Sequence, residues 1–111
     1  MIPALIALGI GALIVAANWD DVVDWLRSFT AKVKAALTGL GHAAKLFAQK
    51  VKTRFLRIMH RLFYKEDGKW FEETTIREID ESEVPAWALE GVSAQEKDVT
   101  QKYKQELSLT L

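Results

Sequence analysis

The N-terminal segment constrains this chain most, because sixteen consecutive side chains carry neither a formal charge nor a hydroxyl group. The run extends from Ile2 to Ala17 and reads IPALIALGIGALIVAA. As a helix it would span about 24 Å, somewhat less than the roughly 30 Å of a bilayer's hydrocarbon core. Trp19 suits the headgroup region, where an indole keeps its ring in apolar surroundings and its N–H near water. We therefore expect residues 1–19 to form a membrane-spanning helix.

Two alternatives stay open for the same run. A cleaved signal peptide would account for the small residues at the end of the run, although no Lys or Arg precedes it as in most signal peptides. A helix buried in the core of an oligomer would need to be covered on every side, because the run has no polar face. Each alternative would keep the segment helical.

Small side chains recur four residues apart within the run. Such spacing lets two helix backbones approach closely, which favours association in lipid. The residues concerned are Ala7, Gly11, Ala12 and Ala16. We expect them to form a helix–helix contact, and we expect the protein to self-associate.

Residues 20–63 show the spacing of an amphipathic helix, with apolar side chains at steps of three and four from Val22 to Leu62. Asn18 is a suitable N-cap, and the aspartates that follow it suit the positive end of the helix dipole. Gly39 and Gly41 interrupt the pattern, and each costs about 1 kcal/mol relative to Ala inside a helix. The pattern therefore predicts one long helix or two helices with a hinge at residues 39–41.

Charge is distributed unevenly along this second segment. Residues 27–61 hold nine basic and no acidic side chains, although the whole chain is formally neutral. A basic face beside an apolar face is typical of a helix that lies on an anionic membrane, and also of a bundle helix with a basic solvated face. No reading motif accompanies the charge, so we do not expect nucleic acid as a partner. The expected membrane-interface residues are Trp19, Lys45, Lys50, Lys52, Arg54, Arg57 and Arg61.

Residues 64–111 have a different pattern. Asp67-Gly68 lies between two aromatic, alternating runs, which predicts a β-hairpin because a tight type I′ turn needs positive φ at both central positions. The carboxylates on the second arm indicate an acidic strand that complements the basic helix. A short helix is expected after Pro85, and a capping-box pattern at Ser93 predicts a last helix whose weak apolar stripe suits a docking tail.

The sequence as a whole predicts a mainly α protein: an apolar helix, a long or hinged basic amphipathic helix, a small hairpin and a C-terminal helix. No catalytic, cofactor-binding or metal-binding set is recognisable, so we expect neither an enzyme nor a cofactor. We expect a homo-oligomeric scaffold or interaction protein that is anchored in a lipid membrane and presents residues 64–111 to a protein partner. The alternative function is a pore-forming or toxin-like effector built by residues 1–63.

The expected orientation follows from the basic residues. No Lys or Arg precedes the apolar run, whereas Arg27, Lys32 and Lys34 follow it closely. Segments rich in Lys and Arg stay in the cytoplasm. The sequence thus predicts a single-pass protein with its N-terminus outside and its C-terminus in the cytoplasm.

Overall fold

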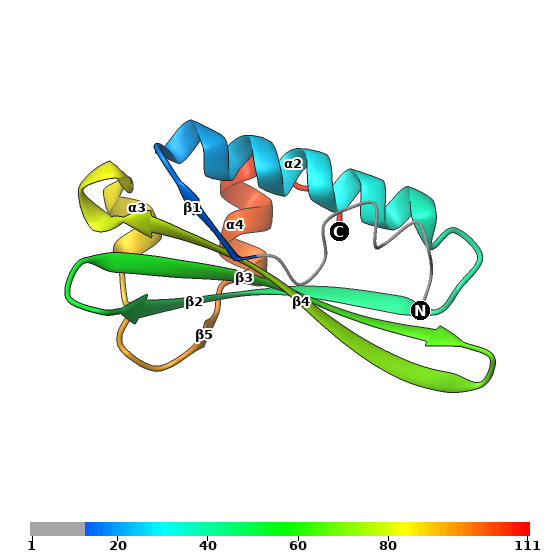
Figure 1. Cartoon of the computed structure of the whole chain (residues 1–111). Coiled ribbons are helices and arrows are strands. Elements are labelled where there is room, and N and C mark those ends of the chain that lie inside the picture. The colour runs from blue at the N-terminus through cyan, green and yellow to red at the C-terminus, as the bar shows by residue number, and fades with distance from the viewer. Residues whose placement is uncertain (1–12) are drawn as a thin grey trace.

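The protein is a mixed α/β fold, seen in a computed structural model that describes residues 13–111. A twisted sheet carries helices on one face only (Figure 1). The strands are β1 (Leu13–Ala16), β2 (His42–Val51), β3 (Phe55–Glu66), β4 (Lys69–Asp80) and β5 (Lys97–Asp98). The helices are α2 (Trp19–Ala36), the short 3-10 turn η1 (Glu81–Glu83), α3 (Ala86–Leu89) and α4 (Thr100–Leu107). The prediction of a mainly α fold is therefore wrong.

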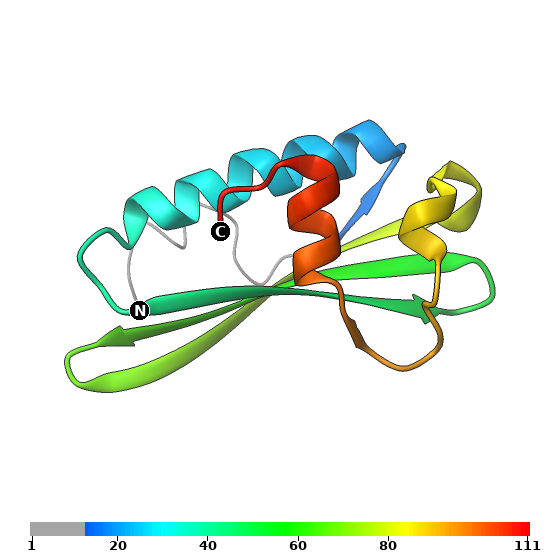
Figure 2. The same ribbon diagram turned by 180° about the vertical axis from the view of Figure 1, so that it is seen from behind.

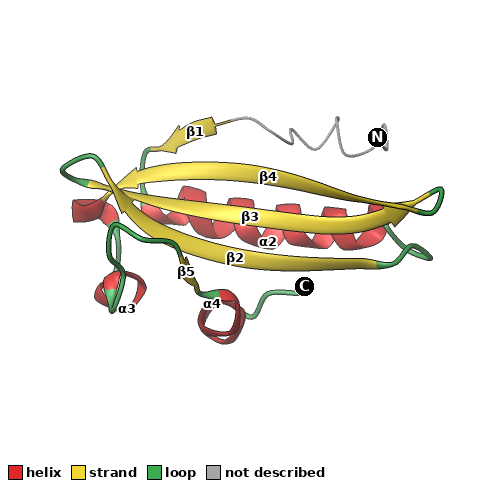
Figure 3. Ribbon diagram, turned by 90° about the horizontal axis from the view of Figure 1, so that it is seen from below, coloured by secondary structure: helices red, strands yellow, loops and turns green. Residues whose placement is uncertain are grey.

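The five strands lie in the order β1-β4-β3-β2-β5. Strands β2, β3 and β4 form an antiparallel meander. Strand β1 pairs with β4 in parallel, and helix α2 then takes the chain from β1 across the sheet to β2. Strand β5 pairs with β2 at two residues only, Phe47 and Ala48. Figure 3 looks at the sheet from the side that no described helix covers, which we call the open face.

Helix α2 begins where the sequence predicts. The Asn18 side chain caps it by accepting a hydrogen bond from the Asp21 N–H at 3.0 Å, which satisfies one of the free donors of the first turn. One side of the helix is buried against the sheet, through Val22, Leu26, Phe29 and Val33. The expected amphipathic helix is thus confirmed for residues 19–36.

The helix expected over residues 42–63 is replaced by strands β2 and β3. In β3, Leu56, Ile58 and Leu62 are buried and face α2, whereas Arg57 and Arg61 alternate with them toward the open face. Alternation of this kind suits a strand, because successive side chains point to opposite faces. Strand β3 carries apolar residues on both of its faces, so its apolar positions also fit the three- and four-residue spacing of a helix.

Gly39 and Gly41 connect a helix to a strand and do not form a hinge between two helices. Gly39 has a φ of +87°, which favours glycine, and it follows the end of α2. The Gly41 carbonyl accepts a hydrogen bond from the Lys65 N–H at 2.9 Å and so continues the pairing of β2 with β3. The chain therefore reverses direction here and returns along the sheet.

Residues 13–16 form strand β1, and this corrects the expectation of a helix up to residue 19. Ala16 packs against the core beside β4, while Ala7, Gly11 and Ala12 lie outside the described residues. Within residues 13–111, none of the helices has the length and apolar character to cross a membrane. The predicted single-pass topology, with an outer N-terminus and a cytoplasmic C-terminus, is therefore wrong. The pore-forming alternative, which needs inserted helices, loses its basis with it.

Asp67 and Gly68 form the two-residue turn between β3 and β4. Their φ angles are 51° and 76°, and the turn joins the paired residues Glu66 and Lys69. Positive φ at both positions is the geometry that the Asp-Gly pattern predicts. The first arm begins at Phe55, however, within the segment for which the sequence predicts a helix.

The C-terminal part belongs to the core and is not a docking tail. Val99, Tyr103 and Leu107 are all buried. Helix α4 lies beside β2 and runs from the level of the sheet toward α2 (Figure 2). Trp19, predicted to lie among lipid headgroups, instead packs edge-on against Trp87 and Tyr103, with ring centroids 5.7 and 6.3 Å away. Helix α4 starts seven residues after Ser93, because the preceding segment runs extended along β2.

His60 lies at the centre of the interface between α2 and the sheet. It is 1% exposed, its ring meets Phe29 edge-on at 4.9 Å, and neither ring nitrogen has a hydrogen-bond partner within the described residues. Burial lowers the pKa of His60 to about 4, because an imidazolium would lose its hydration there. The folded protein therefore holds a neutral histidine well below pH 6.5.

We predict that this burial makes stability depend on pH. An unfolded histidine takes up a proton near pH 6.5, but folded His60 does so only near pH 4, so stability is highest above pH 6.5 and falls as the pH drops toward 4. The loss is on the order of 2–3 kcal/mol in the free energy of unfolding, measured by urea denaturation. The variant His60→Leu should lose this dependence, and His42→Gln should keep it. An unchanged slope in His60→Leu would contradict the assignment.

Candidate functional site

The outer side of β2 is open over its first half. The carbonyl of Leu46 accepts a hydrogen bond from the Val99 N–H, and its N–H donates to the Thr100 hydroxyl, so Leu46 directs its backbone groups away from β3. Backbone groups point the same way at every second residue of a strand, so those of His42 and Ala44 also point outward. Strand β5 reaches only Phe47 and Ala48. Among residues 13–111, no strand pairs with the outer side of His42 or Ala44.

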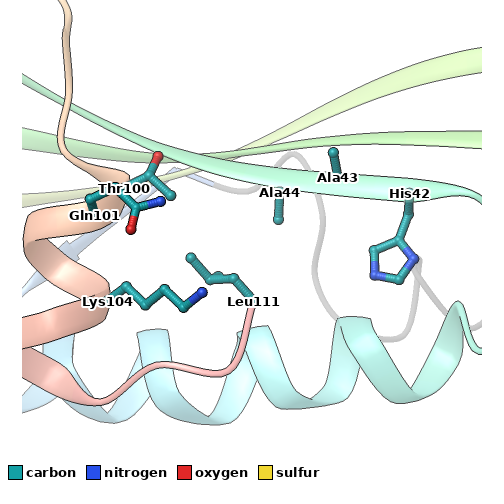
Figure 4. A pocket seen from close by; sticks show the side chains of 7 residues that line it. All are labelled: His42, Ala43, Ala44, Thr100, Gln101, Lys104 and Leu111. Carbon is teal, nitrogen blue, oxygen red and sulfur yellow. The ribbon is translucent and has the colours of Figure 1, made fainter.

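Two adjoining pockets of about 250 and 670 Å³ lie beside this open strand side, and together we call them the β2 groove. They share Ala44, Thr100 and Gln101 as lining residues. Figure 4 shows Thr100, Gln101 and Lys104 on α4 and His42, Ala43 and Ala44 on β2, with the Leu111 side chain below the strand beside that of Lys104. The groove thus has a strand edge as one wall and a helix as the other.

Helix α4 is held firmly as a wall. Tyr103 and Leu107 anchor one side of it in the core. The Thr100 N–H donates to the Asp98 carboxylate at 2.9 Å, and the Thr100 hydroxyl bonds to the backbone of Leu46. At its other end Ser108 adopts a left-handed conformation with φ 54°, and its N–H donates to the Lys104 carbonyl. The wall is therefore fixed to β2 directly and to α2 through the core.

Lysines surround the β2 groove. Lys45 of β2, Lys97 of β5 and Lys102 of α4 line the larger pocket, and Lys104 lines the smaller one. The one carboxylate side chain among the lining residues is that of Asp98, and hydrogen bonds from Thr100, together with the charge of Lys45, hold its pKa below the usual value. The groove is consequently positive at neutral pH.

The lining residues offer no set for covalent or metal chemistry. The smaller pocket contains His42 and the hydroxyl of Thr100, but the hydroxyl is engaged with Leu46 and the His42 ring lies 3.2 Å from the Leu40 carbonyl. Within the described part of the chain, no three His, Cys, Asp or Glu side chains gather to hold a metal ion.

Five of the six basic residues expected at a membrane interface form ion pairs on β2, on β3 and in the turn between them. Their partners are acidic residues on or next to β4, and the pairs are Lys50–Glu81, Lys52–Glu78, Arg54–Asp80, Arg57–Glu78 and Arg61–Glu72, with a further contact of Arg61 to Glu96. The acidic strand does complement the basic segment, as predicted, but that segment is a sheet. Among the six cations only Lys45 has no ion-pair partner in the described residues.

Glu78 is the centre of these pairs. It is fully buried, and one of its oxygens accepts hydrogen bonds from Arg57 Nε and Nη2 at 2.9 and 2.7 Å, while the other accepts one from Lys52 Nζ at 3.0 Å. Burial alone would raise the pKa of Glu78, but the bonds and charges of Arg57 and Lys52 outweigh it and keep the pKa lowered. Glu78 therefore stays ionised and holds β4 to β3 and to the β2–β3 turn.

No motif or residue spacing in the sequence indicates the β2 groove. Residues 42–46 and 98–104 lie far apart in the chain and come together only because β5 and α4 pack beside β2. Lys45 was singled out as a surface cation, but Thr100, Gln101 and Lys104 carry no motif. Comparisons of the chain with protein-family models, with curated proteins and with solved structures found no match.

We predict that Glu78→Gln destabilises the fold by about 1–3 kcal/mol, measured by urea unfolding at pH 7. The range is below that of a wholly buried pair, because the Lys52 and Arg57 side chains remain 61% and 30% exposed. Glu72→Gln is the matched control, since its carboxylate is 55% exposed, and it should change stability by less than about 0.5 kcal/mol. Equal losses in the two variants would show that Glu78 has no special structural role.

Proposed function

We propose that the protein is a non-catalytic interaction module that binds an extended segment of a partner protein along the outer side of β2. The observation that carries the proposal is the open side of β2 at His42 and Ala44, with a groove next to it. A strand edge of this kind pairs readily with another chain, and many recognition domains bind peptides by adding a strand. The interaction protein expected from the sequence thus remains our proposal, without the membrane anchor.

The geometry supports this mode of binding in two ways. An added strand would lie about 4.8 Å from β2, on the line that β5 already occupies further along at Phe47 and Ala48. His42 and Ala44 would each offer one N–H and one C=O, so the peptide backbone could form up to about four hydrogen bonds. Its side chains on one face would enter the pocket in front of Gln101.

The protein's own packing already uses this mode. Lys97 and Asp98 pair with β2 as a short antiparallel strand, and the Lys50 N–H donates to the Ser93 carbonyl at 2.8 Å. The outer side of β2 therefore accepts an extended chain over its second half. The proposed partner segment would occupy the first half.

Self-association of the chain remains a prediction from the sequence. Three of the four small residues expected to mediate it, Ala7, Gly11 and Ala12, lie outside the described residues. The fourth, Ala16, packs against the core. The proposed peptide binding does not depend on self-association, because one chain supplies both walls of the groove.

The test is selection of octapeptides from a random display library on the full chain, followed by measurement of Kd with synthetic peptides. We expect selected peptides to bind with micromolar Kd, and Gln101→Trp to weaken them at least about tenfold by filling the groove. Gln105→Trp is the matched control, since Gln105 is an exposed glutamine of the same helix that lines neither pocket. It should change Kd less than about twofold.

Amide shifts locate the binding site independently. Titration of the isotope-labelled chain with a selected peptide should perturb the N–H groups of His42 and Ala44 most strongly. Thermal unfolding of both tryptophan variants checks that each one is folded. Selected peptides that bind Gln101→Trp as tightly as the original chain, or that perturb only the open face, would contradict the proposal.

A further inference from the structure

We infer that the segment bound in the β2 groove is acidic, with Asp or Glu side chains on both faces of the added strand. The inference rests on the proposed function and adds the chemical class of the partner. Its basis is the distribution of paired and unpaired charge around β2.

Lysine side chains outnumber carboxylate side chains at the groove. Four lysines line it, against the single carboxylate of Asp98, so the lining carries a formal charge of about plus three. Lys45, Lys97 and Lys104 form no ion pair within the described residues, and Lys102 reaches the exposed Glu90 at 3.8 Å. The carboxylates of an acidic ligand would form ion pairs with these lysines.

The contrast with the neighbouring cations is specific to the groove. The other five basic residues between positions 45 and 61 all have a carboxylate within 2.7–3.5 Å, on the open face or at the β2–β3 turn. Lys45 is the exception, and it is the one that lines the groove. Of the basic residues at positions 45–61, Lys45 alone thus has no carboxylate within ion-pair distance among the described residues.

Asp98 offsets only one of the four lysine charges, and the charge of Lys45 contributes to lowering the pKa of its carboxyl group. Its carboxylate accepts the Thr100 N–H at 2.9 Å, and this hydrogen bond holds it at the start of α4. One carboxylate also cannot balance lysines on both sides of the strand. A residue at an odd position of β2, such as Lys45, points to the open face, while Lys104 approaches from the side of α4.

The lysines lie where an added strand would direct its side chains. Alternate residues of a strand point to opposite faces, about 6.6–7 Å apart along each face. Residues on one face of the added strand would meet Lys104, and residues on the other face would meet Lys45. Acidic residues at successive positions would therefore both find a lysine, and rim charges of this kind raise the association rate and favour the matching partner.

A nucleic acid would pair its phosphates with the lysines, but it would leave the outward backbone carbonyls of β2 without hydrogen-bond donors from its own backbone. Its backbone has no N–H group to donate to the carbonyl of Ala44. Non-specific single-strand binders add aromatic rings on which bases stack, and His42 is the only ring among the residues that line the groove. An acidic peptide uses both the charges and the free backbone groups.

The experiment compares three fluorescent octapeptides that differ only in charge: two repeats of Asp-Asp-Thr-Thr, of Asn-Asn-Thr-Thr and of Lys-Lys-Thr-Thr, which we call the Asp-Thr, Asn-Thr and Lys-Thr peptides and which place the variable residue on both faces of a strand. We expect the Asp-Thr peptide to bind the full chain at least about tenfold more tightly than the Asn-Thr peptide in 50 mM salt, with a smaller ratio in 500 mM salt because salt screens exposed charges. The Lys-Thr peptide should bind most weakly. An octathymidylate that binds more tightly than the Asp-Thr peptide would overturn the inference.

A charge-reversed variant gives the second arm. Lys45→Glu with Lys104→Glu should remove the preference for the Asp-Thr peptide and favour the Lys-Thr peptide. Lys32→Glu with Lys34→Glu is the matched control, because both residues are exposed on α2 and the change in net charge is the same. This control should keep a preference for the acidic peptide within about threefold of the original.

The outcomes separate the inference from the proposed function. If the Asn-Thr and Asp-Thr peptides bind equally and Gln101→Trp abolishes both, peptide addition stands and the acidic preference is overturned. If no peptide binds, including those selected from the library, both are overturned. If Lys32→Glu with Lys34→Glu acts as strongly as the groove variant, net charge alone is responsible and the inference fails.

Discussion

The contact between α2 and the sheet is the interaction on which the other elements depend. Leu26 and Phe29 of the helix are buried over strand β3, which is the middle strand and buries Leu56 and Leu62 toward the helix. At about 25 cal/mol per Å², burial of such side chains supplies the main favourable free energy. Once one face of the sheet is covered, α4 can pack only beside α2, next to β2. The groove therefore lies between α4 and the part of β2 that no strand pairs with among the described residues.

Charged side chains in ion pairs, and no described helix, cover the open face of the sheet. Arg61 lies over the Phe47 ring, with its guanidinium carbon 4.6 Å from the ring centroid, and also contacts Glu72 and Glu96. The long side chain covers apolar surface while its charged group remains paired, as arginine often does. Ion pairs thus engage Arg57 and Arg61 of β3 and Lys52 and Arg54 of the turn before it.

Two local signals in the sequence are confirmed, but the capping-box pattern at Ser93 lies seven residues before the helix that it predicts, and strands replace the helix predicted over residues 42–63. The Asn18 cap and the Asp67-Gly68 turn each depend on a few adjacent residues, and both are present. Residues 42–63 failed because β3 is apolar on both faces, Leu62 toward α2 and Phe63 toward the open face, so spacing alone fits either structure. The groove could not be predicted, because it forms between segments that only tertiary packing brings together. The same holds for Glu78, whose role depends on a cross-strand partner.

The parallel pairing of β1 with β4 has a consequence for the order of folding. The meander of β2, β3 and β4 closes through two short turns, whereas Leu13 pairs with Ile76 only after most of the chain has been arranged. Closing so long a loop costs entropy that four residues of pairing repay only in part, and distant contacts of this kind slow folding. We expect β1 to dock late in folding and to detach readily in local unfolding, because only four residue pairs hold it to β4. Each such opening uncovers β4, and the sheet then has free backbone groups at both of its edges.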